Sequence, residues 1–395
     1  MLYQAIRAIR GRREHATMPT IDAIWPLAIA AGCTLCLMPL AILARPTIGI
    51  RVAGVQDLHV EPTSRLGGAI VFLAYIVGIY TSLIFRLAPA RPMVALIACA
   101  LPVIGAGVWE DLTRALPPRH RLLAAATAAL LACLIANGIT ARLDIPYVDR
   151  LLQWAPAFAI VLTCFMAVGA CNAINLIDGA NGLAGGTAVL MFAGIGVVAL
   201  HMGDQLILVQ AAAIAGALVG FLIWNYPKAR IFLGDGGAYF IGFIYAELSI
   251  QIVARNEHLS AWFVIMLAAY PIVETVFSMY RRLVLLRKPS MQPDLLHLHS
   301  LIYRVVTLPA EHARPDTNLD RANARVAPML WLHGLYCFVV ALSFHDNTPA
   351  LLAGFAGYCA IYGVHYRVLS KMRSAEEGAV VLPPKGNGYP AVENE

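Results

Sequence analysis

Four polar, glycine-rich segments interrupt a chain that is otherwise almost continuously apolar, and they carry most of its candidate chemistry. They are Trp109-Glu110-Asp111 and residues 172–186, 225–237 and 294–300. An acidic residue costs about 2.5 to 3.5 kcal/mol at the centre of a membrane helix. Acids that recur at the ends of successive apolar stretches therefore indicate one shared polar site.

The segment 172–186 follows an apolar stretch and contains an Asp-Gly and an Asn-Gly turn. Such turns expose backbone N–H groups and side-chain oxygens at the start of the next helix, where an anion is favoured. A plain turn between two helices would not need the polar set Asn172, Asn175, Asp178 and Asn181. The pattern favours a functional segment over a simple connection.

A second segment, 225–237, repeats this logic. Pro227 ends a helix, and Gly234 and Gly236 let a backbone approach a ligand closely. Asp235 is a hard oxygen donor, which suits Mg²⁺ held jointly by protein and substrate phosphates. The alternative is that Asp235 only caps the next helix.

Two adjacent acids, Glu110 and Asp111, end an apolar stretch just before Arg114, Arg119 and Arg121. Neighbouring carboxylates push one pKa upward, which suits a general base or a second contact with a metal. Arginines are natural partners of phosphates. Taken alone, the run has a simpler alternative, a solvated helix end.

The histidines His297 and His299 follow Asp294 in a long basic loop. Their i, i+2 spacing does not place them on one helix face, which disfavours a helical zinc pair. Among so many cationic side chains they suit phosphate or sugar oxygens.

The rest of the sequence is that of an integral membrane protein. The 395 residues are 59% hydrophobic and 13% charged, with a mean hydropathy of +0.70. Eleven apolar stretches are long enough to cross about 30 Å of hydrocarbon as helices. They start near Ile21, Leu66, Met93, Leu122, Ala155, Leu183, Leu206, Ala238, Ala261, Met329 and Ala350. Because barrel-type alternation is absent, we predict an all-α polytopic fold with about 10–11 transmembrane helices.

Alternating these spans places the polar segments on one side of the membrane. That side carries twenty Lys and Arg residues in its predicted loops and tail, against five on the opposite side. The positive-inside rule then makes the site cytoplasmic. Four N-terminal arginines, Arg7, Arg10, Arg12 and Arg13, conflict with this topology. A start at Met18, or a segment lying on the membrane surface, would remove the conflict.

The predicted organisation has three parts. Residues 1–20 form a basic N-terminal segment, 21–370 a single transmembrane domain, and 371–395 a disordered cytoplasmic tail. The eight cysteines lie mostly in predicted spans, so we interpret them as small buried apolar residues rather than disulfides or zinc ligands. The net charge of +6 lies in the cytoplasmic loops and indicates affinity for anionic lipid or phosphate more than for nucleic acid.

Together with residues 59–68 of the first cytoplasmic loop, the polar segments resemble the polyprenyl-phosphate N-acetylhexosamine-1-phosphate transferases. This is the WecA/MraY superfamily of glycosyltransferase family 4, and the motifs are closer to its WecA-like branch. The resemblance runs from His59 to Arg304, in order and with matching spacing. It implies transfer of a sugar phosphate, with GlcNAc-1-phosphate as the default, from a UDP-sugar to undecaprenyl phosphate. UMP would be released at the bacterial plasma membrane, in O-antigen, capsule or other surface-glycan synthesis.

The resemblance also assigns roles to residues. The family's paired acids fall on Glu110 and Asp111, one of which would deprotonate or position the lipid phosphate, while Arg121 would bind it. Asn175 and Asp235 would be the ligands of Mg²⁺, for which Mn²⁺ is an expected substitute. The remaining predicted catalytic and substrate-binding residues are Asp178, Asn181 and Asn225 facing the uridine, Phe232 stacking on uracil, and Arg65, Asn172, His297 and His299. Apart from the resemblance, we expect Pro271 to break the span before Arg281 and open a groove for the lipid chain; the alternative is that it serves helix packing alone.

Three positions depart from the family pattern. Glu110 stands where Asp is usual, Asn181 where many bacterial members have Asp, and Ser300 where the last histidine of His-x-His-His would be. A non-catalytic lipid-phosphate-binding relative is therefore one alternative. A membrane transporter is another, although its acids would lie nearer the bilayer midplane. UDP-QuiNAc or UDP-FucNAc is the alternative donor, and a homodimer is left open.

Overall fold

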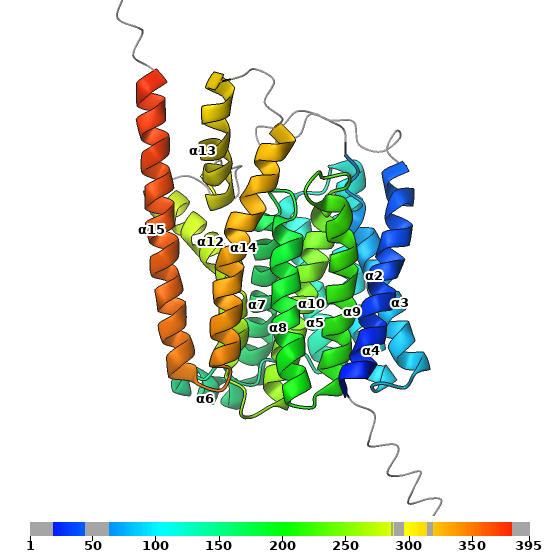
Figure 1. Cartoon of the computed structure of the whole chain (residues 1–395). Helices are drawn as coiled ribbons and strands as arrows, with labels where there is room; N and C mark the ends of the chain where they lie inside the picture. Colours follow the sequence, from blue (N-terminus) through cyan, green and yellow to red (C-terminus); the bar gives the residue numbers. More distant parts are fainter. Residues whose placement is uncertain (1–18, 44–62, 286, 288–295, 314–318, 381–395) are drawn as a thin grey trace, which may run out of the picture.

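The computed structural model is a bundle of long helices that run along a common direction (Figure 1). It describes residues 19–43, 63–285, 287, 296–313 and 319–380. Within these ranges no strand forms, and the one isolated bridge joins Ser64 to Ile231. The predicted all-α class is confirmed. The basic N-terminal segment up to residue 18, residues 59–62 and Asp294 lie outside the described residues.

Nine of the described helices are long and apolar enough to cross a membrane. They are α2 (Pro19–Leu43), α3 (Gly67–Ile84), α4 (Ala90–Thr113), α5 (Pro118–Ile135), α7 (Pro156–Ile177), α8 (Leu183–His201), α9 (Gln205–Asn225), α10 (Gly234–Arg255) and α14 (Leu319–Ser343). The chain is thus a multi-pass membrane protein. Two shorter helices, α6 (Pro146–Trp154) and α13 (Leu298–Ala313), lie at opposite ends of the bundle (Figure 1).

One further pair of helices is apolar enough to form a broken span or a re-entrant loop. The helices α11 (Ala261–Leu267) and α12 (Ala269–Tyr280), the latter continued by a π-helical turn η1 (Arg281–Leu285), meet at 74°. Pro271 explains the break, because it has no N–H to donate to the carbonyl of Leu267 four residues earlier. The predicted interruption before Arg281 is therefore present.

The last predicted span falls on α15 (Thr348–Val380), which stands at the edge of the bundle beside α13 and α14 (Figure 1). It is not among the nine helices above. It also continues to Val380, so residues 371–380 are helical where we expected disorder. The reason is local, because this stretch is rich in Lys, Met, Arg, Ala and Glu, which favour helix.

The centre of the bundle is α10, because 94% of the residues in its apolar core stretch are buried, the highest share among the nine candidate spans. Small residues let α3 and α4 approach it closely. A Cβ on Gly68 of α3 would collide with the backbone of Gly237, and a Cβ on Gly107 of α4 would collide with that of Gly236. These glycines thus let the start of α10 pack closely against the start of α3 and the last turns of α4.

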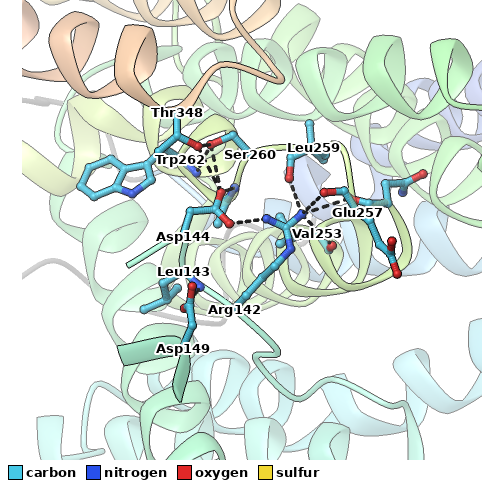
Figure 2. Close-up of polar contacts among 12 residues, drawn as sticks. Arg142, Leu143, Asp144, Asp149, Val253, Glu257, Leu259, Ser260, Trp262 and Thr348 are labelled. Atoms are coloured by element: carbon cyan, nitrogen blue, oxygen red, sulfur yellow. Dashed lines mark hydrogen bonds and ion pairs between the residues drawn. The ribbon is translucent and has the colours of Figure 1, made fainter. Parts of the chain in front are cut away.

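A polar clamp secures the other end of α10, and Figure 2 shows it. The guanidinium of Arg142 forms an ion pair with Asp144. It also donates to the carbonyl of Val253 in the last turn of α10 and to those of Asn256, Glu257 and Leu259, which follow the helix. A cation favours a helix C-terminus, where carbonyls lack partners.

The same clamp holds two further helices. The Asp144 carboxylate accepts hydrogen bonds from the N–H of Ala261 (2.7 Å), which begins α11, and from the hydroxyls of Ser260 (3.2 Å) and Thr348 (3.3 Å), the latter at the start of α15. Burial alone would raise the pKa of Asp144, but the Ala261 N–H and Arg142 outweigh it and lower the pKa. The carboxylate is therefore ionised at neutral pH.

We expect Asp144→Ala to lower the thermal unfolding temperature in detergent, because hydrogen bonds to an ionised group contribute about 1.5 to 3 kcal/mol each. A depressed pKa stabilises the fold above the unfolded pKa of about 3.9 and ceases to do so as the pH falls through the folded value. The deficit should therefore persist from pH 7 down to about pH 4 and vanish below it. Asp149→Ala, which removes one contact to the N–H of Leu143, is the matched control. An equal loss in both variants would contradict the clamp.

Candidate active site

The polar segments meet at the end of the bundle opposite the Arg142 clamp. Asp111, at the end of α4, is 6% exposed, and its two oxygens accept hydrogen bonds from the N–H groups of Asp235 and Gly236, each 2.8 Å long. These N–H groups open α10 and have no partner inside the helix. Asp111 therefore caps α10 from a neighbouring helix.

This arrangement leaves the side chain of Asp235 available for other contacts, so capping is not its function. Its Oδ1 accepts from the amide of Asn175 at 3.1 Å, and its Oδ2 forms an ion pair with Arg121 in the first turn of α5. Arg121 also lies over the ring of Tyr239, 5.8 Å from its centroid. Three separate helices thus deliver a carboxylate, an amide and a guanidinium to one point.

Asp178 lies in the turn between α7 and α8 and is partly buried. No side-chain hydrogen bond of its carboxylate is found among the described residues. Burial raises the pKa of Asp178 to about 7, although the charge of Arg65 opposes the shift. Arg65 also acts on Asp111, so one arginine serves two of the predicted catalytic acids.

His297 immediately precedes α13, and His299 lies in its first turn. Their rings are stacked, with centroids 5.5 Å apart and an angle of 6° between the ring planes. His299 is buried against Gly179, the residue that follows Asp178, where a Cβ would collide with the imidazole ring. Burial lowers the pKa of His299 to about 4, helped by the charge of His297. His299 is therefore neutral near pH 7 and can contribute a hydrogen bond but not a charge.

Several asparagines predicted to touch substrate have internal partners. Asn225 accepts from the N–H of Gly182 at 2.6 Å and donates to the carbonyl of Ile231 at 2.7 Å. Asn172 accepts from the hydroxyl of Tyr239 at 3.2 Å and donates to a carbonyl of its own helix. These contacts shape the two polar segments, and a substrate role for either residue stays a prediction.

Asn181 differs from these two. Its backbone N–H donates to Asn323 at 2.9 Å and its amide nitrogen donates to the carbonyl of Pro227 at 3.0 Å. Its Oδ1 is buried without a hydrogen-bond partner. Such an oxygen is costly unless a ligand or water satisfies it. Asn181 is thus the asparagine of this set best placed to accept from a ligand.

Phe232 and Arg65 are brought together through the backbone. The N–H of Phe232 donates to the carbonyl of Ser64 at 2.8 Å, and its carbonyl accepts from Gly67 at 3.1 Å. The partly buried Glu110 accepts from the N–H of Leu116 at 2.7 Å, so it also braces the turn between α4 and α5. All predicted site residues therefore lie at this end of the bundle, although not all of them touch one another.

Two polar neighbours of the site were missed from the sequence. Tyr239 lies four residues after Asp235, so helical spacing could have placed it on the same face. Asn323 lies on α14, beyond the motifs, and no local pattern indicates that it contacts Asn181.

The donor atoms at this site suit Mg²⁺. Among the described residues, no group of three or more His, Cys, Asp or Glu side chains is arranged to hold a metal. Mg²⁺, however, usually binds through one or two protein oxygens, with substrate phosphates and water completing six ligands. The adjacent side chains of Asn175 and Asp235 fit that mode once the amide turns its oxygen toward the carboxylate.

Comparisons with known proteins agree with this geometry. The model of glycosyl transferase family 4 matches residues 93–253. The chain is 30% identical over 263 residues to a probable undecaprenyl-phosphate N-acetylglucosaminyl 1-phosphate transferase of Bacillus subtilis, covering 64% of this chain and 70% of the relative. It is 27% identical over 354 residues to a decaprenyl-phosphate N-acetylglucosaminephosphotransferase of Mycobacterium tuberculosis, covering 82% and 83%.

A third relative, a phospho-N-acetylmuramoyl-pentapeptide-transferase of Leuconostoc citreum, is 30% identical over 262 residues, covering 61% of this chain and 79% of the relative. The family match includes α4, α7 and the start of α10, which carry Asp111, Asn175 and Asp235. The chain therefore belongs to the polyprenyl-phosphate N-acetylhexosamine-1-phosphate transferases of glycosyl transferase family 4, a family of membrane phosphotransferases.

Proposed function

We propose that this protein transfers an N-acetylhexosamine 1-phosphate, with GlcNAc as the default sugar, from a UDP-sugar to undecaprenyl phosphate. The observation that carries the proposal is the meeting of Asp111, Asp178 and Asp235 beside Arg65 and Arg121 at one end of a membrane bundle. An oxygen of the lipid phosphate attacks the phosphorus that bears the sugar, and UMP leaves. The acceptor's chain stays in the bilayer while its phosphate reaches this end.

Phosphoryl transfer depends mostly on positioning and on neutralising charge. When bound, Mg²⁺ at Asn175 and Asp235 would neutralise charge on the diphosphate. Arg121, paired with Asp235, lies where it can exchange that carboxylate for a substrate phosphate. Glu110 is proposed to deprotonate or position the lipid phosphate. The buried Asp111 holds the start of α10, and with it Asp235, in place.

The nucleotide is proposed to lie over the segment between α7 and α8. The unpartnered Oδ1 of Asn181 supports this placement, because a uracil or ribose donor would satisfy it. The partly buried Phe232, held by its backbone to residues 64 and 67, is the proposed stacking partner of the base. We place the site on the cytoplasmic side of the bacterial plasma membrane, in surface-glycan synthesis, with the asymmetry of Lys and Arg as support.

The deciding experiment is transfer of radiolabel from UDP-GlcNAc, and in parallel from UDP-QuiNAc and UDP-FucNAc, into an organic-extractable lipid. We expect label in the organic phase only when undecaprenyl phosphate and Mg²⁺ are present, with equimolar UMP released. Binding of UDP-sugar without transfer would indicate a non-catalytic relative. Label carried across a sealed vesicle membrane without chemical change would indicate a transporter.

Asp235→Ala should reduce transfer at least about 100-fold, the scale seen when one preorganised charge contact to a transition state is lost. Insertion and thermal stability should stay near wild type, because Asp111 and not Asp235 caps α10. The matched control is Asp204→Ala, which breaks the ion pair with Arg255 at the far end of α10. Transfer near the wild-type rate in purified Asp235→Ala would refute the assignment.

Glu110→Gln should lower kcat by about 100-fold, within the range of general-base effects, and leave UDP-sugar affinity unchanged. Gln can still accept the N–H of Leu116, so the turn should persist. Glu110→Asp should keep much of the activity because relatives use Asp there. Steady-state kinetics at saturating Mg²⁺ measure all three enzymes, and an unchanged kcat in Glu110→Gln would assign the residue to the turn alone.

Phe232→Ala should weaken UMP binding by about 1 to 3 kcal/mol, the contribution of one stacked base. Its backbone bonds to residues 64 and 67 do not involve the ring and should remain. Calorimetric titration measures the affinity of both enzymes for UMP, and steady-state kinetics measure their KM for undecaprenyl phosphate. Equal losses for both substrates would mean that the ring only packs.

A further inference from the structure

The histidine segment, residues 296–299, is held by a buried acid that lies outside the polar segments of the site. Glu274 on α12 is 0% exposed. Its Oε1 lies 3.1 Å from Nδ1 of His297 and accepts from the N–H of Leu298 at 3.2 Å. Its Oε2 accepts from the hydroxyl of Tyr362 on α15 at 3.0 Å. One carboxylate therefore fixes His297 through both its ring and the following backbone.

These contacts favour one tautomer of His297. An ionised carboxylate can only accept, and Leu298, Tyr362 and Ser278 all present donors to Glu274. The hydroxyl of Ser278 also lies 3.1 Å from Nδ1 of His297. Because the Ser278 hydroxyl can donate to Glu274 and accept from His297, we assign the proton of His297 to Nδ1. A partner on one ring nitrogen sets the role of the other, so Nε2 is the atom that His297 can offer to a substrate.

A second contact runs parallel to the first. Arg281, 4% exposed at the end of the broken span, donates to the carbonyl of Leu296 at 2.5 Å and to the hydroxyl of Tyr366 at 2.7 Å. Its guanidinium also lies over the rings of Phe277 and Tyr366. The carbonyl before His297 and the N–H after it are thus both anchored.

Both anchors end on α15. Tyr362 and Tyr366 are four residues apart, so they share one face of that helix. The two rings are stacked at 6.3 Å, and α15 packs against α12 and α13 at this edge of the bundle (Figure 1). The family match ends at residue 253, well before all three helices.

We propose that Tyr362 and Tyr366 of α15 are positioning residues that orient His297, through Glu274 and Arg281, for the phosphate or sugar of the substrate. The inference rests on the proposed function for the identity of that substrate. Tyr362 contacts Glu274 and Tyr366 contacts Arg281, so each tyrosine acts on His297 through one of these two side chains.

The test compares Tyr362→Phe with Tyr358→Phe. Each substitution removes one buried hydroxyl from α15, but that of Tyr358 bonds His333 on α14 at 3.2 Å and not the histidine segment. In metal sites, loss of a partner that orients a ligating residue typically costs about 10- to 100-fold in metal affinity or activity, and we expect an effect at the lower end of that range for His297. We expect kcat in Tyr362→Phe to fall about 10-fold with the KM for undecaprenyl phosphate within about twofold, and Tyr358→Phe to keep its kcat within about twofold.

Hydrogen–deuterium exchange gives a readout that does not need activity. Because the N–H of Leu298 donates to Glu274, we expect faster exchange in peptides covering residues 296–304 of Tyr362→Phe and not of Tyr358→Phe. Glu274→Gln, of equal size but without charge, should show a larger change in the same peptides.

Three outcomes would overturn the inference: equal kcat losses in the two tyrosine variants, a loss confined to KM for the lipid, or unchanged exchange in residues 296–304. If the wild-type protein transfers no sugar phosphate, the proposed function is refuted instead. In that case the exchange data alone still decide whether α15 anchors the histidine segment.

Discussion

The hydrogen bonds from the first N–H groups of α10 to Asp111 are the contact on which the site depends. A helix that starts inside a packed membrane bundle cannot leave these donors to water. Asp111 satisfies two of them from α4, one with each oxygen of its carboxyl group. Because the cap comes from another helix, Asp235 is free to face Asn175 and Arg121. Gly107 permits this by letting α4 approach α10.

Side chains from other parts of the chain thus bind the backbone at both ends of α10, with Asp111 at the start and Arg142 at the end. The far clamp also holds α15 through the contact of Asp144 with Thr348. The middle of α15 carries Tyr362, which contacts Glu274 beside the histidine segment. A single helix therefore contacts both the Arg142 clamp, at its first residue, and the acid that holds the histidine segment, about four turns later.

The asparagines of the polar segments divide into two kinds. Asn225 and Asn172 have their amides engaged inside the protein, so they shape the loops that surround the substrate space. Asn181 has a buried oxygen without a partner. The same residue type therefore serves the fold at one position and is available to a ligand at another. This division explains why a turn between two helices needs so many polar side chains.

The sequence by itself determined the all-α membrane class, because each span must satisfy its own backbone and its apolar length is local information. It also determined the polar segments, their placement at one end and the break near Pro271. Only the tertiary structure decided that Asp111 caps α10, that Asn225 bonds Gly182, and that Glu274 joins His297 to Tyr362. These pairs come from separate helices, and a lone Asp, Asn or Tyr does not specify its partner. Their geometry depends on how closely glycines let the helices pack.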